Sequence, residues 1–163
     1  MDGQPARDTP AAVDAMAVAV RAKVSSCPAP FLPRVAGRRK RALGDLFGLR
    51  NFGVNLTRLG PGDASSLHHR HSRQDEFVYV VEGEPTLVTD AGETPLRPGW
   101  CAGFPAGGTA HHLENRTARD VLYLEVGDRG AGDEVEYPRD DLALVPDPAT
   151  GRRRYARKDG SLW

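Results

Sequence analysis

Residues 62–83, GDASSLHHRHSRQDEFVYVVEG, hold the pattern that decides the fold: two alternating histidines, a carboxylate and an apolar run. Side chains two positions apart in a strand point to the same face, so His69 and His71 can direct two imidazoles at one point. After a short polar turn, Glu76 opens the run FVYVV, which is typical of a strand. A neighbouring strand would thus bring a carboxylate to the two imidazoles, and such a set suits a divalent metal.

A second histidine window follows at residues 105–115, PAGGTAHHLEN. The chain contains five histidines, and all of them lie in these two windows. Histidines scattered over surface and core positions would rarely gather so tightly, so we interpret the two windows as one site. The predicted metal ligands are His69, His71, Glu76 and His111.

The two windows resemble the two motifs of the cupin family, and the resemblance covers roughly residues 50–127. Each window departs from the family spacing by one additional residue between its glycine and its histidine, which we interpret as a loop insertion. The matching residues are Gly62, His69, His71, Glu76 and Gly83 in the first motif and Gly99, Pro105, Gly107, His111 and Asn115 in the second. The resemblance implies a double-stranded β-helix, or jelly-roll barrel, that holds one metal ion and acts on a small molecule.

The residues alone also predict an all-β fold. From Leu43 onward, short apolar segments such as FGVNLTRL (52–59) and VLYLEV (121–126) are separated by glycine and proline turns. No long helical period interrupts these segments, so a double-sheet jelly roll is the simplest architecture that buries them.

A chain of 163 residues is ordinarily one domain. We expect an N-terminal arm with a proline-rich tether over residues 1–42, the barrel over 43–127, and a C-terminal extension over 128–163 that packs on the barrel or on a second subunit. In the arm, Thr9 before a proline predicts a short helix, and alternation from Met16 predicts an extended segment that could add an edge strand. Cupins often pair, so a homodimer is the expected assembly.

The charge balance excludes some partners. The chain has 22 basic and 22 acidic residues, so its net charge of zero provides no field for a nucleic acid. Two basic runs, residues 37–41 and 152–158, are interpreted as solvated surface that could attract an anionic substrate. A small neutral or anionic molecule is the expected ligand.

Two cysteines, Cys27 and Cys101, lie far apart in the sequence, so we expect no disulfide. Cys101 is interpreted as a small buried hydrophobic residue. No apolar run reaches the roughly 18 residues that a membrane span needs, and the N-terminus lacks the apolar core of a signal peptide. We therefore expect a soluble cytoplasmic protein without a membrane partner.

Three imidazoles and one carboxylate suit Fe, Mn, Ni, Zn or Cu, and the ligand types do not select among these metals. A six-coordinate ion would keep two positions for water, dioxygen or a bidentate substrate, which is typical of a catalytic metal.

Further residues near the motifs have two interpretations each. Glu125 and Tyr79 are candidate catalytic residues if they face the cavity, although a carboxylate such as Glu125 is more often exposed or paired. His68 and His112 should face away from the ligands beside them, either at the surface or as groups that support the ligands. Asn115 should fix a turn. Tyr79, Trp100, Phe104 and Tyr123 could line the cavity, and Arg70 and Arg73 could hold a substrate carboxylate or face water.

Three functions are compatible with this pattern. The leading hypothesis is a non-haem iron dioxygenase, an oxidoreductase, because oxygen activation needs chiefly the metal and its open positions. A metal-dependent isomerase, epimerase or lyase is the alternative, in which the metal polarises a carbonyl and a nearby acid or base moves a proton. A non-catalytic binding or sensor cupin would use the same pocket without turnover.

Overall fold

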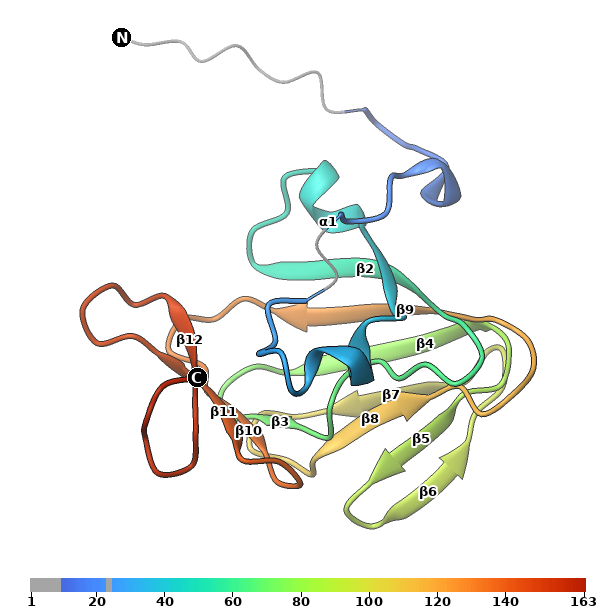
Figure 1. Cartoon of the computed structure of the whole chain (residues 1–163). Helices are drawn as coiled ribbons and strands as arrows, with labels where there is room; N and C mark the ends of the chain where they lie inside the picture. The colour runs from blue at the N-terminus through green and yellow to red at the C-terminus, as the bar shows by residue number, and fades with distance from the viewer. Residues whose placement is uncertain (1–9, 23–24) are drawn as a thin grey trace, which may run out of the picture.

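The computed structural model describes residues 10–22 and 25–163, and its regular secondary structure consists almost entirely of antiparallel strands (Figure 1). The strands are β1 (Arg39–Ala42), β2 (Phe52–Leu59), β3 (Arg70–His71), β4 (Glu76–Glu82), β5 (Thr86–Thr89), β6 (Gly92–Pro95), β7 (Cys101–Phe104), β8 (His111–Glu114), β9 (Val121–Asp128), β10 (Val135–Tyr137), β11 (Leu142–Pro146) and β12 (Arg153–Ala156). One α-helical turn, α1 (Leu43–Leu46), and two 3₁₀ turns, η1 (Ala15–Ala17) and η2 (Leu32–Val35), complete the described elements. The predicted all-β class is confirmed.

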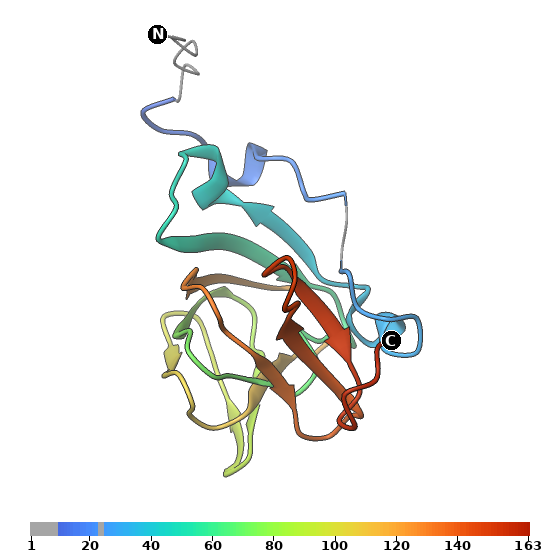
Figure 2. The ribbon, with the colours of Figure 1, turned by 90° about the vertical axis from the view of Figure 1, so that its left-hand side faces the viewer.

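Three sheets form the barrel. Their strand orders are β1-β2-β9-β4-β7, β12-β11-β10-β3 and β6-β5-β8. An isolated bridge between His69 and His111 joins the segment before β3 to β8, so the two histidine windows meet directly. Figures 1 and 2 place β10–β12, drawn in orange to red, at one end of the barrel, where β10 pairs with β3.

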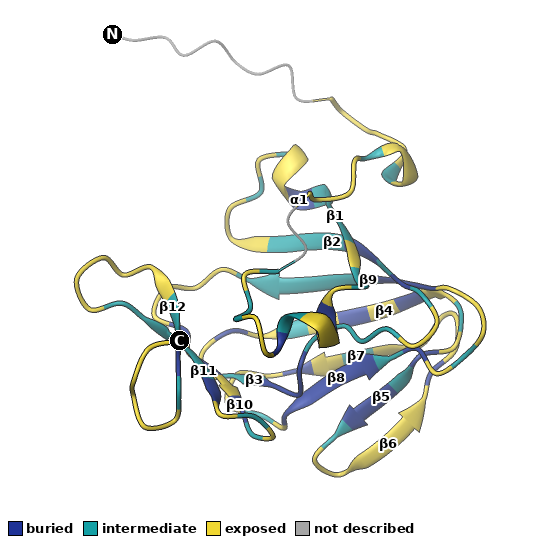
Figure 3. Cartoon of the chain, viewed as in Figure 1, coloured by how far each residue is buried: buried dark blue, intermediate teal, exposed yellow. Residues whose placement is uncertain are grey.

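The strands alternate between an apolar core and the outer surface. Along β4, Val78 and Val80 are buried, whereas Phe77, Tyr79 and Val81 are exposed. In the third sheet β8 is buried and the edge strand β6 is exposed (Figure 3). The core cluster that fills the barrel consists of Leu59, Val78, Val80, Leu87, Leu96, Phe104, Leu113, Val121 and Tyr123. Burial of each large apolar side chain stabilises the fold by about 1.5–3 kcal/mol.

A second apolar cluster joins the tether to the C-terminal extension. Phe31 and Val35, around η2, pack with Leu142 at the start of β11 and with residues of β10. Trp163 extends this cluster: its ring contacts Phe31 edge-on, with 5.1 Å between the ring centroids. The Trp163 Nε1–H also donates a hydrogen bond to the Asp141 carbonyl at 3.0 Å. The apolar segment near residue 143 therefore packs within its own chain, and the homodimer stays a prediction.

The N-terminal segment differs from the prediction. Thr9 lies outside the described residues, and the expected helix is reduced to η1, where Asp14 Oδ1 accepts from the Met16 N–H at 2.9 Å. Residues 16–22 form no strand because their apolar side chains find no core; Met16 is 42% exposed. The edge strand is formed instead by part of the first basic run, because β1 (Arg39–Ala42) pairs with β2. This strand begins four residues before residue 43, where the barrel was predicted to start. The arm touches β1 through the hydrogen bond from Arg21 N to Lys40 O (2.8 Å), and Figure 2 shows it beside α1.

Cys101 also departs from its prediction, because its side chain is exposed. It pairs in register with Tyr79 and shares the outer face of the sheet, so the neighbouring Ala102 is the residue that packs against the core. Both cysteines are free. None of the helical turns within residues 10–22 and 25–163 has the length and apolar character needed to cross a membrane.

Candidate metal centre

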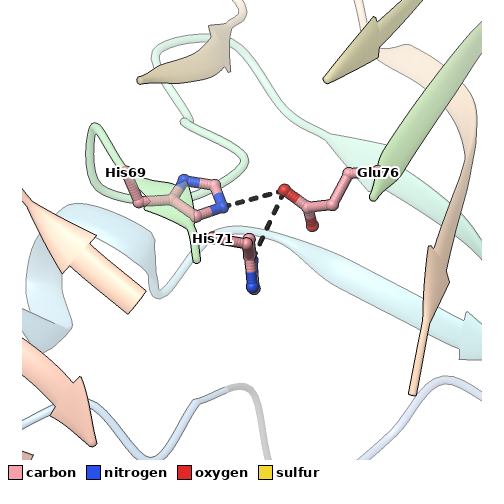
Figure 4. A group of neighbouring side chains, drawn as sticks. All are labelled: His69, His71 and Glu76. Carbon is pink, nitrogen blue, oxygen red and sulfur yellow. Dashed lines mark hydrogen bonds and ion pairs between the residues drawn. The ribbon is translucent and has the colours of Figure 1, made fainter. Parts of the chain in front are cut away.

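The structure brings all four predicted ligands to one point. The Nε2 atoms of His69 and His111 each lie 3.1 Å from Glu76 Oε2, and His71 Nε2 lies 3.5 Å from the same oxygen. Figure 4 shows His69 and His71 directed at this carboxylate from one strand segment while Glu76 reaches in from β4. Ligand atoms of His69, His71 and Glu76 all lie within 4.8 Å of one another, a spacing that a single metal ion could bridge.

The other ring nitrogens fix the protonation of these histidines. His71 Nδ1 lies 2.7 Å from Asp133 Oδ2, His69 Nδ1 lies 3.0 Å from the Leu67 carbonyl, and His111 Nδ1 lies 3.4 Å from the Thr109 carbonyl. Carbonyl and carboxylate oxygens only accept, so each Nδ1 carries the proton and each Nε2 presents its lone pair to Glu76.

The orientation of the Nε2 lone pairs toward Glu76 bears on whether a metal ion fits between them. Three lone pairs and a carboxylate that face one another repel unless a proton or a cation lies between them. The Nδ1 partners are those that hold metal-binding histidines in their ligating tautomer. The residues therefore fit one divalent transition metal, with Glu76 as its anionic ligand.

Glu76 is ionised in this setting. Burial alone would raise the pKa of its carboxyl, but the facing imidazoles of His111 and His69 outweigh burial and hold the pKa well below its usual range. A carboxylate that stays charged at neutral pH is the form that a cation binds.

Asp133 is a site residue that the motifs did not reveal. It is 2% exposed, and its Oδ1 accepts from the backbone N–H groups of Arg73 (2.9 Å) and Gln74 (3.2 Å). Its Oδ2 holds His71 and also accepts from Arg153 Nη2 at 2.9 Å. Asp133 lies in the polar segment after the barrel, and only the pairing of β10 with β3 brings it to His71.

His68 and His112 form a separate cluster, which we call the closed cluster together with Asp90 and Glu114. Both histidines face away from the ligands as predicted, but they are buried at 2% and 6% exposure and do not lie at the surface. Their Nδ1 atoms lie 3.1 Å apart, His68 Nε2 lies 2.8 Å from Asp90 Oδ1, and His112 Nε2 lies 2.9 Å from Glu114 Oε1. Burial lowers the pKa of His112, although the hydrogen bond that its Nε2–H donates to Glu114 acts in the opposite direction.

The four ligands open into two adjoining cavities. The inner cavity, about 100 Å³, is lined by His69, Glu76 and His111, and the outer one, about 470 Å³, by His71 and Glu76. Phe104 lines the inner cavity and stacks on the ring of His111 at 3.4 Å between centroids, which fixes the plane of that ligand. Glu76 lies in both cavities, so a bound metal would face the space inside the barrel and the space at its mouth.

Glu125 lines both cavities beside Glu76. It pairs in register with Val78, two residues along β4 from Glu76, and therefore points to the same face as Glu76. Its Oε1 accepts from Lys40 Nζ and from Asn55 Nδ2 (3.1 Å), and the Tyr123 hydroxyl lies 3.3 Å from Oε2. The structure thus combines both interpretations of Glu125, which is paired and also faces the cavity.

The remaining predicted residues lie elsewhere. Tyr79 and Trp100 are each 41% exposed, and Tyr79 is on the outer face of β4, so neither lines the metal cavities. Arg70 forms an exposed pair with Glu136. Asn115 is buried and holds backbone as predicted, since its Nδ2 donates to the carbonyls of Leu59 (3.0 Å) and Arg119 (2.7 Å).

Comparison with known proteins identifies the family. Residues 55–127 match the family model described as a cupin domain. A crystal structure from Silicibacter pomeroyi, named a sugar phosphate isomerase from a cupin superfamily, is 41% identical and superposes with a TM-score of 0.86 over 93% of this chain and 96% of that chain. The chain belongs to the cupin superfamily.

Two further solved structures are similar to this chain at lower sequence identity. A protein of Acidithiobacillus ferrooxidans, provisionally named a sugar phosphate isomerase, is 29% identical, with a TM-score of 0.69 over 82% of this chain and 92% of that chain. The polyketide cyclase RemF of Streptomyces resistomycificus is 21% identical, with a TM-score of 0.60 over 72% of this chain and 78% of that chain, and it shares the fold alone. A search of the curated proteins gives no match for this cupin.

Proposed function

We propose that this cupin is a metal-dependent isomerase that acts on a sugar phosphate. The observation that carries the proposal is the 41% identity, over nearly the whole chain, to the protein of Silicibacter pomeroyi named a sugar phosphate isomerase. The site chemistry agrees with it, because a second carboxylate stands beside the metal ligands in the same cavity.

His69, His71, Glu76 and His111 would hold the metal. A divalent ion bound there supplies Lewis acidity that polarises a carbonyl or hydroxyl oxygen of the sugar. The protein's part is to keep each Nε2 deprotonated, through Asp133 and the carbonyls that hold the Nδ1 atoms.

Glu125 is the proposed base. Isomerisation of an aldose to a ketose moves the proton on C2 to the carbonyl carbon C1, while the proton of the O2 hydroxyl passes to O1. One group can accept the carbon-bound proton and return it to the other carbon, and this is the part we assign to Glu125. Lys40 and Asn55 occupy Glu125 Oε1, whereas among the described residues Oε2 meets only the Tyr123 hydroxyl, at a long 3.3 Å. Oε2 is therefore the atom best placed to accept the proton.

The dioxygenase hypothesis is less well supported. The similar structures from Silicibacter pomeroyi and Acidithiobacillus ferrooxidans are both named as isomerases, and neither name mentions an oxygenase. Oxygen activation does not need a second carboxylate such as Glu125, which Lys40 and Tyr123 hold in place. Proton transfer does need an acid or base in that position. The isomerase alternative accounts for Glu125 and its partners, and we adopt it.

The test is hydrogen exchange by the metal-loaded protein. Loaded in turn with Fe²⁺, Mn²⁺, Ni²⁺ or Zn²⁺, it is incubated with a panel of aldose and ketose phosphates in D₂O, and NMR follows conversion and deuterium uptake. We expect both with at least one sugar phosphate, and a loss of about 10²–10⁴-fold in rate for Glu125→Gln with the metal content unchanged.

Glu82→Gln is the matched control, because Glu82 is an exposed glutamate at the end of β4 and its replacement should leave the rate unchanged. The proposal fails if no sugar phosphate exchanges or converts with any metal. Oxygen uptake by the iron-loaded protein with a small organic substrate would restore the dioxygenase hypothesis.

A further inference from the structure

A cavity rich in positive charge adjoins the metal site on the side of β1. We call it the basic cleft; it measures about 540 Å³. Its polar lining residues are Arg21, Ser25, Ser26, Arg38, Lys40 and Tyr155. Among the described residues that line it, none is acidic. Three cations with hydroxyl groups between them form a surface that suits an anion.

The basic cleft adjoins the inner metal cavity. Arg38 and Lys40 line both spaces. Arg38 immediately precedes β1 and Lys40 is the second residue of that strand, so their side chains, two positions apart, point to the same side of the chain. A molecule with an anionic end in the cleft could therefore reach past Lys40 and Glu125 toward Glu76.

Arg38 is the cation with unused bonding capacity. Within the described residues it forms no ion pair, and its Nη1 donates only to the Ser65 carbonyl. Its Nε is buried without a hydrogen-bond partner, which is unfavourable unless a ligand supplies an acceptor. In contrast, Arg21 pairs with Asp45 and Lys40 pairs with Glu125.

The mouth of the outer cavity also contains arginines, but Arg153 and Arg129 each already pair with a carboxylate. Arg153 donates to Gln74 and to Asp133, and Arg129 pairs with Asp45. An anion there would compete with carboxylates that the fold already places. The basic cleft is the better anion site.

We propose that the basic cleft binds the phosphate group of the substrate, with Arg38 as the principal contact and Ser25, Ser26 and Tyr155 as additional hydrogen-bond donors. A guanidinium donates two parallel hydrogen bonds to a phosphate, and Arg38 Nε is free to make one of them. The inference rests on the proposed function and specifies which end of the sugar phosphate lies farthest from the metal. Arg38 then determines specificity for phosphorylated sugars.

The first experiment measures binding without turnover. Inorganic phosphate is titrated into the metal-loaded protein by calorimetry, for the parent, for Arg38→Gln and for Arg119→Gln, an exposed arginine far along the chain from the cleft. We expect Arg38→Gln to weaken phosphate binding at least about tenfold and Arg119→Gln to leave it unchanged. Equal affinities for the parent and Arg38→Gln would overturn the proposal.

A second variant guards against a folding defect. Ser26 is exposed, so Ser26→Asp should fold normally and place a negative charge in the cleft. Repulsion should weaken phosphate binding without changing metal content. Unchanged phosphate affinity in Ser26→Asp contradicts the proposal independently of Arg38.

Kinetics separate this inference from the proposed function. With a sugar phosphate and its unphosphorylated counterpart as substrates, Arg38→Gln should raise KM for the phosphorylated sugar only. If Arg38→Gln lowers kcat/KM equally for both sugars, the isomerase stands and the phosphate assignment fails. If phosphate binds through Arg38 but no sugar phosphate is converted, the basic cleft stands and the isomerase fails.

Discussion

The molecule contains two histidine clusters that differ by one position along the same strands. His69 and His111 point into the barrel mouth, while their neighbours His68 and His112 point the other way into the closed cluster. In the closed cluster both Nε2 atoms meet a carboxylate of their own, Asp90 or Glu114. In the metal centre three Nε2 atoms share a single carboxylate oxygen.

The difference shows that residue type does not decide what a histidine does. The same imidazoles become structural where each nitrogen has a partner, and become ligands where three lone pairs face one acceptor. The pleat of the strand selects between the two, because one position of shift turns a side chain to the opposite face. Each cluster also has an aspartate that holds a histidine, Asp133 at His71 and Asp90 at His68.

Removal of the charge on Asp133 should affect metal binding more than removal of the charge on Asp90. We expect Asp133→Asn to weaken metal affinity about 10–100-fold, because the asparagine no longer holds His71 in its ligating tautomer as firmly. This corresponds to about 1.4–2.7 kcal/mol of binding free energy. Competition with a chelator of known affinity measures it, and an unchanged affinity would show that His71 does not depend on Asp133.

Asp90→Asn is the matched change in the closed cluster and should have the smaller effect. The variant should bind metal as the parent does, and it should lose about 0.5–1.5 kcal/mol of unfolding free energy, the usual net contribution of a hydrogen bond. Urea denaturation with metal analysis measures both. Loss of metal in Asp90→Asn would mean that the two clusters are not independent.

The effect of Asp90 should also depend on pH. Its hydrogen bonds with His68 and with the Ala110 N–H lower the pKa of its carboxyl from the ordinary value of 3.8. A lowered pKa in the folded state contributes stability that is present above the unfolded value and lost as the pH falls through the folded one. The stability difference between parent and Asp90→Asn should therefore disappear in acid.

The convergence of the four candidate ligands could be predicted because the sequence information for it is local. Alternation places His69 and His71 on one face, and the family spacing adds Glu76 and His111. Asp133 could not be predicted, because it reaches His71 only through the pairing of Val135 with His71, which no local pattern encodes. The link from Lys40 to Glu125 has the same origin, since it depends on β1 pairing at the sheet edge.

The errors in the fold have a related cause. Apolar alternation predicted an extended arm at Met16 that could add an edge strand, but alternation forms a strand only where a core buries its apolar side, and Met16 is 42% exposed. Cys101 was predicted to be buried from its residue type, but the register with Tyr79 places it on the outer face. Residue type and periodicity thus predicted the strands better than the faces they present.

Metal content after replacement of His69 and His71 shows whether these side chains bind a metal ion. The parent, His69→Ala/His71→Ala, and Arg70→Ala are loaded with metal, dialysed and analysed by mass spectrometry for ions per chain; Arg70 lies between the two ligands and pairs only at the surface with Glu136. We expect about one ion per chain in the parent and in Arg70→Ala, and a folded double variant without stoichiometric metal. If the double variant retains its ion as the parent does, His69 and His71 are not metal ligands.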